Sequence, residues 1–187
     1  MVDTLETARS LSVPPRDPGW PHVLISAYMC APNRGSEPGK SWHWVTHLAR
    51  HCRVSVITQA VHRTEIEAGL KQDPQPNLRF HYVSGPAWLR VVKYDQLRYH
   101  MNYVAWQRLA LERAGQLLRS DPFDLVHHIC FASITRPIFM QQLPVPLIFG
   151  PVGGGELGHK AFWKGGGLGA SAYEWLRTKR MRMLRWD

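Results

Sequence analysis

One glycine-bearing segment, Gly35-Ser-Glu-Pro-Gly39, is placed where it could hold an oxygen-rich ligand. It follows an apolar run over residues 22–27 that is typical of a buried strand, and it precedes residues 41–51, whose pattern predicts a helix. A loop between a first strand and a first helix is where open α/β proteins hold phosphates and sugars. The function of the chain therefore depends on what this segment can bind.

The segment ends like a phosphate-binding P-loop, in Gly39-Lys40-Ser41, but it departs from that motif in three ways. The pattern G-x-x-x-x-G-K-[ST] requires a glycine at the position that Arg34 occupies. Pro38 removes an N–H from the backbone cradle, and Glu37 would face phosphate with a negative charge. The dinucleotide fingerprint GxGxxG is absent too, which disfavours a hydride-transferring oxidoreductase. A surface turn shaped by glycine and proline is the alternative.

Composition and charge narrow the class of protein. The chain has 187 residues, 44% of them hydrophobic, which suffices for one globular domain with a sizeable core. A net charge of +9 and an isoelectric point near 9.9 favour an acidic partner such as nucleic acid, anionic lipid or a phosphorylated substrate. The alternative is a basic surface without a dedicated ligand. No apolar run has the length of a membrane-spanning helix, and the acidic-polar start is unlike a signal peptide.

Three cysteines, Cys30, Cys52 and Cys130, are odd in number and form no CxxC pair. They are typical of reduced, buried thiols in an intracellular protein. We therefore expect a cytoplasmic protein, with a peripheral position on the inner face of the membrane left open.

Strand and helix patterns alternate along the chain. The expected strands cover residues 22–27, 53–58, 78–83, 123–129 and 145–149, and the expected helices cover residues 41–51, 61–71, 94–119, 134–142 and 171–187. This alternation predicts a Rossmann-like parallel β-sheet flanked by helices. We expect a flexible arm over residues 1–20 and one domain over residues 21–187. The last helix has no glycine or proline after it, so we expect the domain to be truncated there.

Three histidines could form a metal site, since His43, His47 and His51 share one face of the first helix. No HExxH motif or cysteine accompanies them, and Val45 and Leu48 mark the buried side of the helix instead. We therefore expect a solvated histidine face and no metal.

Three motifs, taken in order, resemble the N-terminal domain of a glycosyltransferase family 4 enzyme. They are Gly35-Ser-Glu-Pro-Gly39 followed by Trp42 and Trp44, then Asp124-Leu-Val-His-His128, then Phe149-Gly-Pro-Val-Gly-Gly-Gly-Glu156. Each lies at the end of an expected parallel strand, where ligands of open α/β sheets gather. The resemblance runs from about residue 21 onward. It implies the N-terminal half of a GT-B fold and a retaining enzyme that moves a sugar from a nucleotide-sugar to a saccharide or lipid-linked acceptor. The nucleotide-sugar is a co-substrate, and no cofactor is expected.

The resemblance also implies roles for particular residues. The substrate-binding residues would be Gly35, Ser36, Glu37, Pro38 and Gly39 on one side of an interdomain cleft, and Gly153, Gly154 and Gly155 at the end of the fifth strand. His127 falls where family members place the first histidine of an H-x-H pair, but the second position is Ile129, with His128 beside it instead. Catalytic residues stay unassigned, with His127 and His128 as candidates. These neighbours point to opposite faces of a strand, so we expect one in the core and the other nearer the cleft.

A second Rossmann-like domain, carrying an E-x7-E motif and the basic residues that bind the donor diphosphate, is also implied. Nothing after Glu156 supplies such a domain. We therefore expect an acceptor-side half, inactive without a C-terminal domain or subunit.

The stretch from Lys160 to Trp186 interleaves basic and aromatic residues, which suits an anionic membrane surface. The same composition suits single-stranded nucleic acid, a less favoured partner, or an interface with the missing domain. The alternative function is thus a non-catalytic basic module that binds anionic membrane or nucleic acid. In the long helix, Tyr99, Tyr103 and Trp106 are expected to pack in the core.

Overall fold

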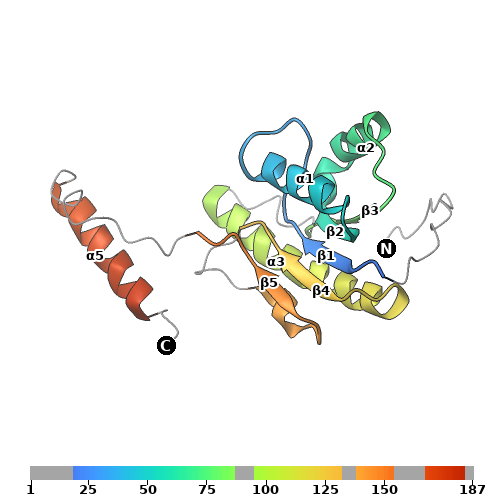
Figure 1. Cartoon of the computed structure of the whole chain (residues 1–187). Helices are drawn as coiled ribbons and strands as arrows, with labels where there is room; N and C mark the ends of the chain where they lie inside the picture. The colour runs from blue at the N-terminus through green and yellow to red at the C-terminus, as the bar shows by residue number, and fades with distance from the viewer. Residues whose placement is uncertain (1–18, 87–94, 132–137, 154–166, 184–187) are drawn as a thin grey trace.

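The computed structural model describes residues 19–86, 95–131, 138–153 and 167–183, so the expected arm lies almost wholly outside the described residues. Strands alternate with helices along the chain, as Figure 1 shows. The order is β1 (His22–Ser26), α1 (Ser36–Leu48), β2 (Arg53–Gln59), the 3-10 turn η1 (Ala60–His62), α2 (Arg63–Gln72), β3 (Leu78–Val83), α3 (Asp95–Ser120), β4 (Leu125–His128), the 3-10 turn η3 (Phe139–Gln142), β5 (Leu147–Phe149) and α5 (Gly167–Met183).

The five strands form one parallel sheet in the order β3-β2-β1-β4-β5. Ile25 in β1 pairs with Val56 of β2 on one side and with His127 of β4 on the other. From β1 the chain therefore adds β2 and β3 on one side of the sheet. It then crosses over and adds β4 and β5 on the other side. Such a reversal is a topological switch point, and in open α/β sheets ligands bind in a crevice at the carboxyl ends of the two strands beside it, which here are β1 and β4. The prediction of a Rossmann-like parallel sheet flanked by helices is confirmed.

Helices cover both faces of the sheet (Figure 1). All five residues of β1 are buried, as expected for a strand packed on both faces. His127 and His128 are neighbours in β4, so their side chains point to opposite faces of the sheet. The His127 ring lies 5.5 Å from the Trp44 ring of α1, and His128 hydrogen bonds to Tyr103 of α3. α1 and α3 thus lie on opposite faces. The largest fully buried side chains are Trp106, Tyr103, Leu24, Ile25, Ile57, Ile66, Ile129 and Met140.

The expected start of the first helix, Ser41, is wrong, because α1 begins at Ser36. Pro38 is compatible with a first helical turn, where a backbone N–H has no partner within the helix. Glu37 is favourable there as well, because its charge complements the helix dipole. Glu37 and Pro38, which oppose a phosphate cradle, thus suit a helix N-terminus.

The expected helix over residues 134–142 is wrong in its described part. Residues 132–137 lie outside the described residues, and Ile138 is extended. Only the single 3-10 turn η3 follows, and it ends with a hydrogen bond from the Leu143 amide to the Met140 carbonyl. Pro144 and Pro146 then favour extended backbone.

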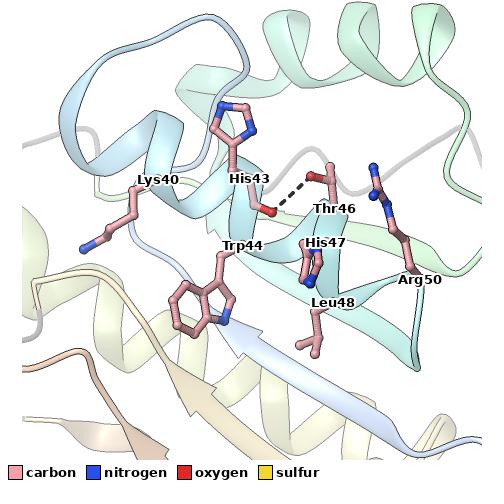
Figure 2. Close-up of a pocket in the computed structure, with 7 residues that line it drawn as sticks. All are labelled: Lys40, His43, Trp44, Thr46, His47, Leu48 and Arg50. Carbon is pink, nitrogen blue, oxygen red and sulfur yellow. Dashed lines mark hydrogen bonds between the residues drawn. The ribbon is translucent and has the colours of Figure 1, made fainter.

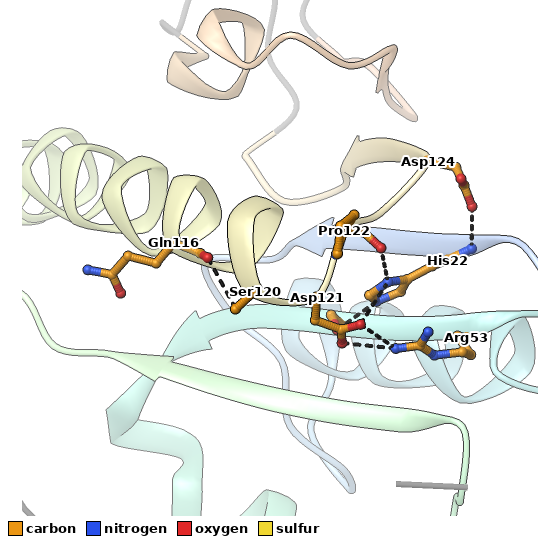
Figure 3. Close-up of polar contacts among 8 residues, drawn as sticks. His22, Arg53, Gln116, Ser120, Asp121, Pro122 and Asp124 are labelled. Atoms are coloured by element: carbon orange, nitrogen blue, oxygen red, sulfur yellow. Dashed lines mark hydrogen bonds and ion pairs between the residues drawn. The ribbon is translucent and has the colours of Figure 1, made fainter. Parts of the chain in front are cut away.

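A polar cluster joins elements at the opposite, amino edge of the sheet (Figure 3). His22 Nδ1 donates to the Pro122 carbonyl at 2.8 Å, and Nε2 accepts from the Ser55 hydroxyl at 2.9 Å. Arg53 donates to both carboxylate oxygens of Asp121, at 2.8 and 2.9 Å. Burial acts to raise the pKa of Asp121, but the hydrogen bonds from Arg53 and the nearby positive charges outweigh it and lower the pKa. Each polar group thus has a partner within the fold, so this edge has a structural role.

No helix among the residues described by the structure is long and apolar enough to cross a membrane.

Candidate functional site at the carboxyl ends of β1 and β4

Strained backbone gathers around the crevice between β1 and β4. Among the described residues other than glycine, three have positive φ: Asn33 at 56°, Ser36 at 58° and Phe131 at 50°. The first two follow β1, and Phe131 follows β4. A bulky residue such as phenylalanine rarely adopts this left-handed conformation, and strain of this kind concentrates at binding sites.

The predicted glycine loop is mostly the first turn of α1. Gly35 precedes the helix as its N-cap, and Ser36 begins α1 with the left-handed φ noted above, while Glu37, Pro38 and Gly39 continue its first turn. No side chain caps the helix at Gly35. The free N–H groups of a helix N-terminus bind oxygen atoms of ligands. The oxygen-binding feature of the segment is therefore a helix N-terminus at the crevice, which the sequence pattern did not reveal.

The two glycines of this segment have different roles. A Cβ added at Gly39 would lie 1.9 Å from the backbone oxygen of Arg34, so Gly39 is needed for the close approach of the β1–α1 loop to the helix. A Cβ added at Gly35 would meet nothing within 4 Å, and Gly35 has an ordinary φ of −76°. Of the two, only exposed Gly35 adjoins open space that a ligand could enter.

Ser41, which would have been the last residue of a P-loop, points into the protein. Its hydroxyl lies 2.9 Å from the Cys130 sulfur and donates to the Glu37 carbonyl at 2.9 Å. The Cys130 thiol in turn donates to the carbonyl of Met29 at 3.1 Å. These contacts link α1 to the segments that follow β4 and β1.

Both candidate histidines are engaged with the protein. His127 Nε2 donates to the carbonyl of Gly150 at 2.9 Å, and burial lowers its pKa against the opposing effect of that hydrogen bond. His128 is fully buried between the hydroxyls of Ser26 and Tyr103, at 2.9 and 3.1 Å, and burial lowers its pKa to about 4. His128 is thus a core residue, while His127 is 9% exposed beneath α1.

The third predicted motif begins where β5 ends. Gly150 has a φ of 150° and donates its N–H to the His128 carbonyl, which holds this turn against β4. Gly153 is half-buried at the same edge of the sheet. Gly154 and Gly155 lie outside the described residues, so the structure does not place them.

An aromatic cluster borders the crevice on the α3 side. The rings of Tyr28 and Phe131, from the segments after β1 and β4, lie 5.1 Å apart, and Tyr99 of α3 contacts both. Tyr103 and Trp106 are fully buried, as expected, but Tyr99 is 38% exposed at the edge of the cluster. Tyr28 and Phe131 were missed from sequence because each ends an apolar strand segment and looks like a core residue.

A polar hollow of about 410 Å³ lies between the β1–α1 loop and α2. It is lined by Pro32, Asn33, Arg34, Glu65, Ala68, Gly69 and Gln72. The guanidinium of Arg34 donates two hydrogen bonds to the carboxylate of Glu65, so these opposite charges offset each other. Planar amide, guanidinium and carboxylate groups of this kind can donate to and accept from hydroxyl groups.

His43 and His47 on α1 are exposed, as predicted, and so is His51, although α1 ends at Leu48 rather than at the expected residue 51. No group of three metal-ligating side chains occurs among the residues that the structure describes.

On α5, the exposed side chains Tyr173, Trp175 and Leu176 are 66%, 55% and 59% accessible, and the Lys179 ammonium lies 5.2 Å from the centre of the Trp175 ring. The rest of the predicted basic–aromatic stretch lies largely outside the described side chains.

Comparison with known proteins adds one structural likeness. No family model matches the chain, and no curated protein matches it. Among solved structures, the chain is similar to UGT73P12 of Glycyrrhiza uralensis, a GT-B glycosyltransferase solved in complex with glycyrrhetinic acid 3-O-monoglucuronide. The two are 15% identical with a TM-score of 0.42, over 59% of this chain and 24% of that one. The chain thus spans about a quarter of that protein, and the likeness concerns the fold alone.

Proposed function

We propose that this chain is the acceptor-side domain of a retaining, family 4-type glycosyltransferase with the GT-B architecture. It would bind the acceptor that receives the sugar. A second domain or subunit would hold the nucleotide-sugar donor on the other side of the crevice. One observation carries the proposal: all three sequence motifs reach the carboxyl edge of the sheet, and two of them flank the switch point between β1 and β4. Segments that follow parallel strands meet at this edge, so residues after β1 and β4 can contact one ligand there.

The chemistry of this edge suits an acceptor rich in hydroxyl groups. The N-terminus of α1 offers N–H donors, and the carboxylate of Glu37 offers an acceptor in the same turn. We assign Glu37 the task of accepting a hydrogen bond from the acceptor hydroxyl and orienting it toward the donor sugar. Orientation of this kind, together with stabilisation of the departing diphosphate by the second domain, would supply the rate enhancement.

Reconstituted transfer tests the proposal. Fusion or mixing of this chain with the donor-binding domain of a GT-B enzyme should restore release of nucleoside diphosphate in the presence of pooled saccharide acceptors. Glu37→Gln in that assembly should lower the rate about tenfold or more, because a neutral amide oxygen accepts a weaker hydrogen bond than a carboxylate and the amide NH2 can turn toward the reacting hydroxyl instead. Glu67→Gln on α2 is the matched control and should leave the rate unchanged. A stable two-domain assembly that binds the donor and transfers no sugar to any acceptor would count against the proposal.

A further inference from the structure

A groove of about 610 Å³ runs along the exposed side of α1 (Figure 2). Its described lining is Lys40, His43, Trp44, Thr46, His47, Leu48 and Arg50, so the lining follows α1 and extends just past its end. Cavities of this size hold small molecules in other proteins. None of the features assigned so far explains the groove.

The sheet side of the groove is apolar. Trp44 projects from α1 toward the strands, with 40% of its surface exposed, and Leu48 lies one turn further along (Figure 2). His127 contacts Trp44 and pairs in register with Ile148, so the Ile148 side chain lies on this same face of the sheet. Ile148 is 49% exposed. Ile148, which is outside the described lining of the groove, thus adds one partly exposed apolar side chain on the face of the sheet beside α1.

The rim of the groove is basic. Lys40 and Arg50 lie at its two ends, and His43 and His47 lie between them. The sequence of α1 contains one acidic residue, Glu37, in its first turn. An apolar floor with a basic rim is complementary to an amphiphile that has a hydrocarbon tail and an anionic head.

The Lys40 end of the groove adjoins the candidate site. Lys40 directly follows Gly39 and lies three residues after Glu37, so this end of the groove is about one helical turn from the N-terminus of α1. α1 rises about 1.5 Å per residue, so the span from Lys40 to Arg50 is about 15 Å, which matches an extended chain of about twelve methylene groups.

We propose that this groove binds the hydrocarbon tail of a lipid phosphate, whose phosphate lies at Lys40 and whose head group enters the crevice. The proposal rests on the proposed function, since it specifies the acceptor as lipid-linked rather than as a free saccharide. The occupant is a single amphiphile, not a bilayer surface. Helix α5 is a poorer occupant, because Arg177 and Lys179 would bring positive charge to a basic rim.

Binding of dodecyl phosphate below its critical micelle concentration tests this inference without any need for sugar transfer. The tryptophan fluorescence of the whole chain should report saturable, one-to-one binding, and calorimetry should give the affinity. Affinity should rise about threefold to fourfold for each added methylene from octyl to dodecyl, because each one leaves water for the groove.

Matched variants locate the site. Trp44→Ala should weaken dodecyl phosphate binding at least tenfold, and Lys40→Gln should weaken it severalfold. The controls Val61→Ala and Lys71→Gln alter an exposed apolar residue and an exposed basic residue on η1 and α2, and neither should change the affinity. Circular dichroism confirms that each variant is folded before its affinity is compared.

Four results would overturn the inference. They are equal affinity for octyl and dodecyl phosphate, equally tight binding of inorganic phosphate, binding to anionic phospholipid vesicles with none to monomeric dodecyl phosphate, and dimerisation in which Trp44 is protected by a second copy. If the chain binds dodecyl phosphate but its two-domain assembly transfers no sugar, the groove stands and the proposed function fails. If the assembly transfers sugar to free saccharides but the chain binds no dodecyl phosphate, the proposed function stands and the lipid groove fails.

Discussion

Replacement of Gly39 by alanine is expected to lower the free energy of unfolding by about 3 kcal/mol or more, a large fraction of the stability of a small domain. The added Cβ would lie 1.9 Å from the Arg34 carbonyl oxygen, and both groups belong to backbone that cannot rotate away. The β1–α1 loop would have to move, although alanine by itself favours a helix by up to about 1 kcal/mol over glycine. Urea unfolding followed by circular dichroism measures the difference.

Gly35→Ala is the matched control, because this glycine lies in the same segment and gains the same methyl group. Its Cβ meets nothing within 4 Å, and its φ is −76°, so we expect a loss of no more than about 1 kcal/mol, the cost of alanine at a helix N-cap. Equal destabilisation by the two substitutions would contradict the assignment of Gly39 to loop packing and of Gly35 to the open crevice.

Acidification is expected to destabilise the domain through its buried histidines. Burial lowers the pKa of His128 to about 4, against a usual value near 6.5 in the unfolded chain. Between those two values the unfolded state binds a proton that the folded state does not, so stability is highest above pH 6.5 and falls as the pH drops toward 4. The slope is about 1.4 kcal/mol per pH unit for one histidine, or about 3 kcal/mol over the whole interval.

His81 contributes in the same direction. Burial and the neighbouring positive charge of Arg113 lower its pKa to about 4 as well. Urea unfolding of the His128→Gln and His81→Gln variants at several pH values between about 7 and 4.5 should show, in each, a slope smaller than the wild-type slope by up to about 1.4 kcal/mol per pH unit. The slope that is left comes from other histidines whose pKa burial lowers, such as His22 and His127. A slope that neither variant reduces would contradict the burial of neutral histidines in β3 and β4.

The helices and strands of this chain can largely be predicted from patterns of residues that are close in the sequence. Apolar runs such as Val54 to Ile57 can be placed as strands because a parallel sheet buries both faces of its strands. The solvated stripe at His43, His47 and His51 follows likewise from helical spacing. These features depend on residues close in sequence, which a pattern can read.

The candidate site was harder to predict, because its details depend on contacts between distant segments. Glu37 and Pro38 resembled loop residues, but they start a helix once the Arg34 carbonyl packs on Gly39. Phe131, with its strained backbone, contacts Tyr28 and so joins the segments that follow β4 and β1. Because β2 and β3 lie between these segments in the sequence, no local pattern reveals the contact. The roles of the two histidines similarly depend on which helix covers each face of β4.

A backbone amide NMR titration of the whole chain with a panel of saccharides tests most directly whether the carboxyl edge of the sheet is one wall of a sugar-transfer cleft. If it is, at least one saccharide should shift the amide signals of Gly35, Ser36, Glu37 and Phe131. Signals from the cluster around His22 and Asp121, at the opposite edge, should stay in place. Saccharides that leave the first group unmoved throughout the panel, or that shift only the second, would contradict a sugar-binding role for the carboxyl edge.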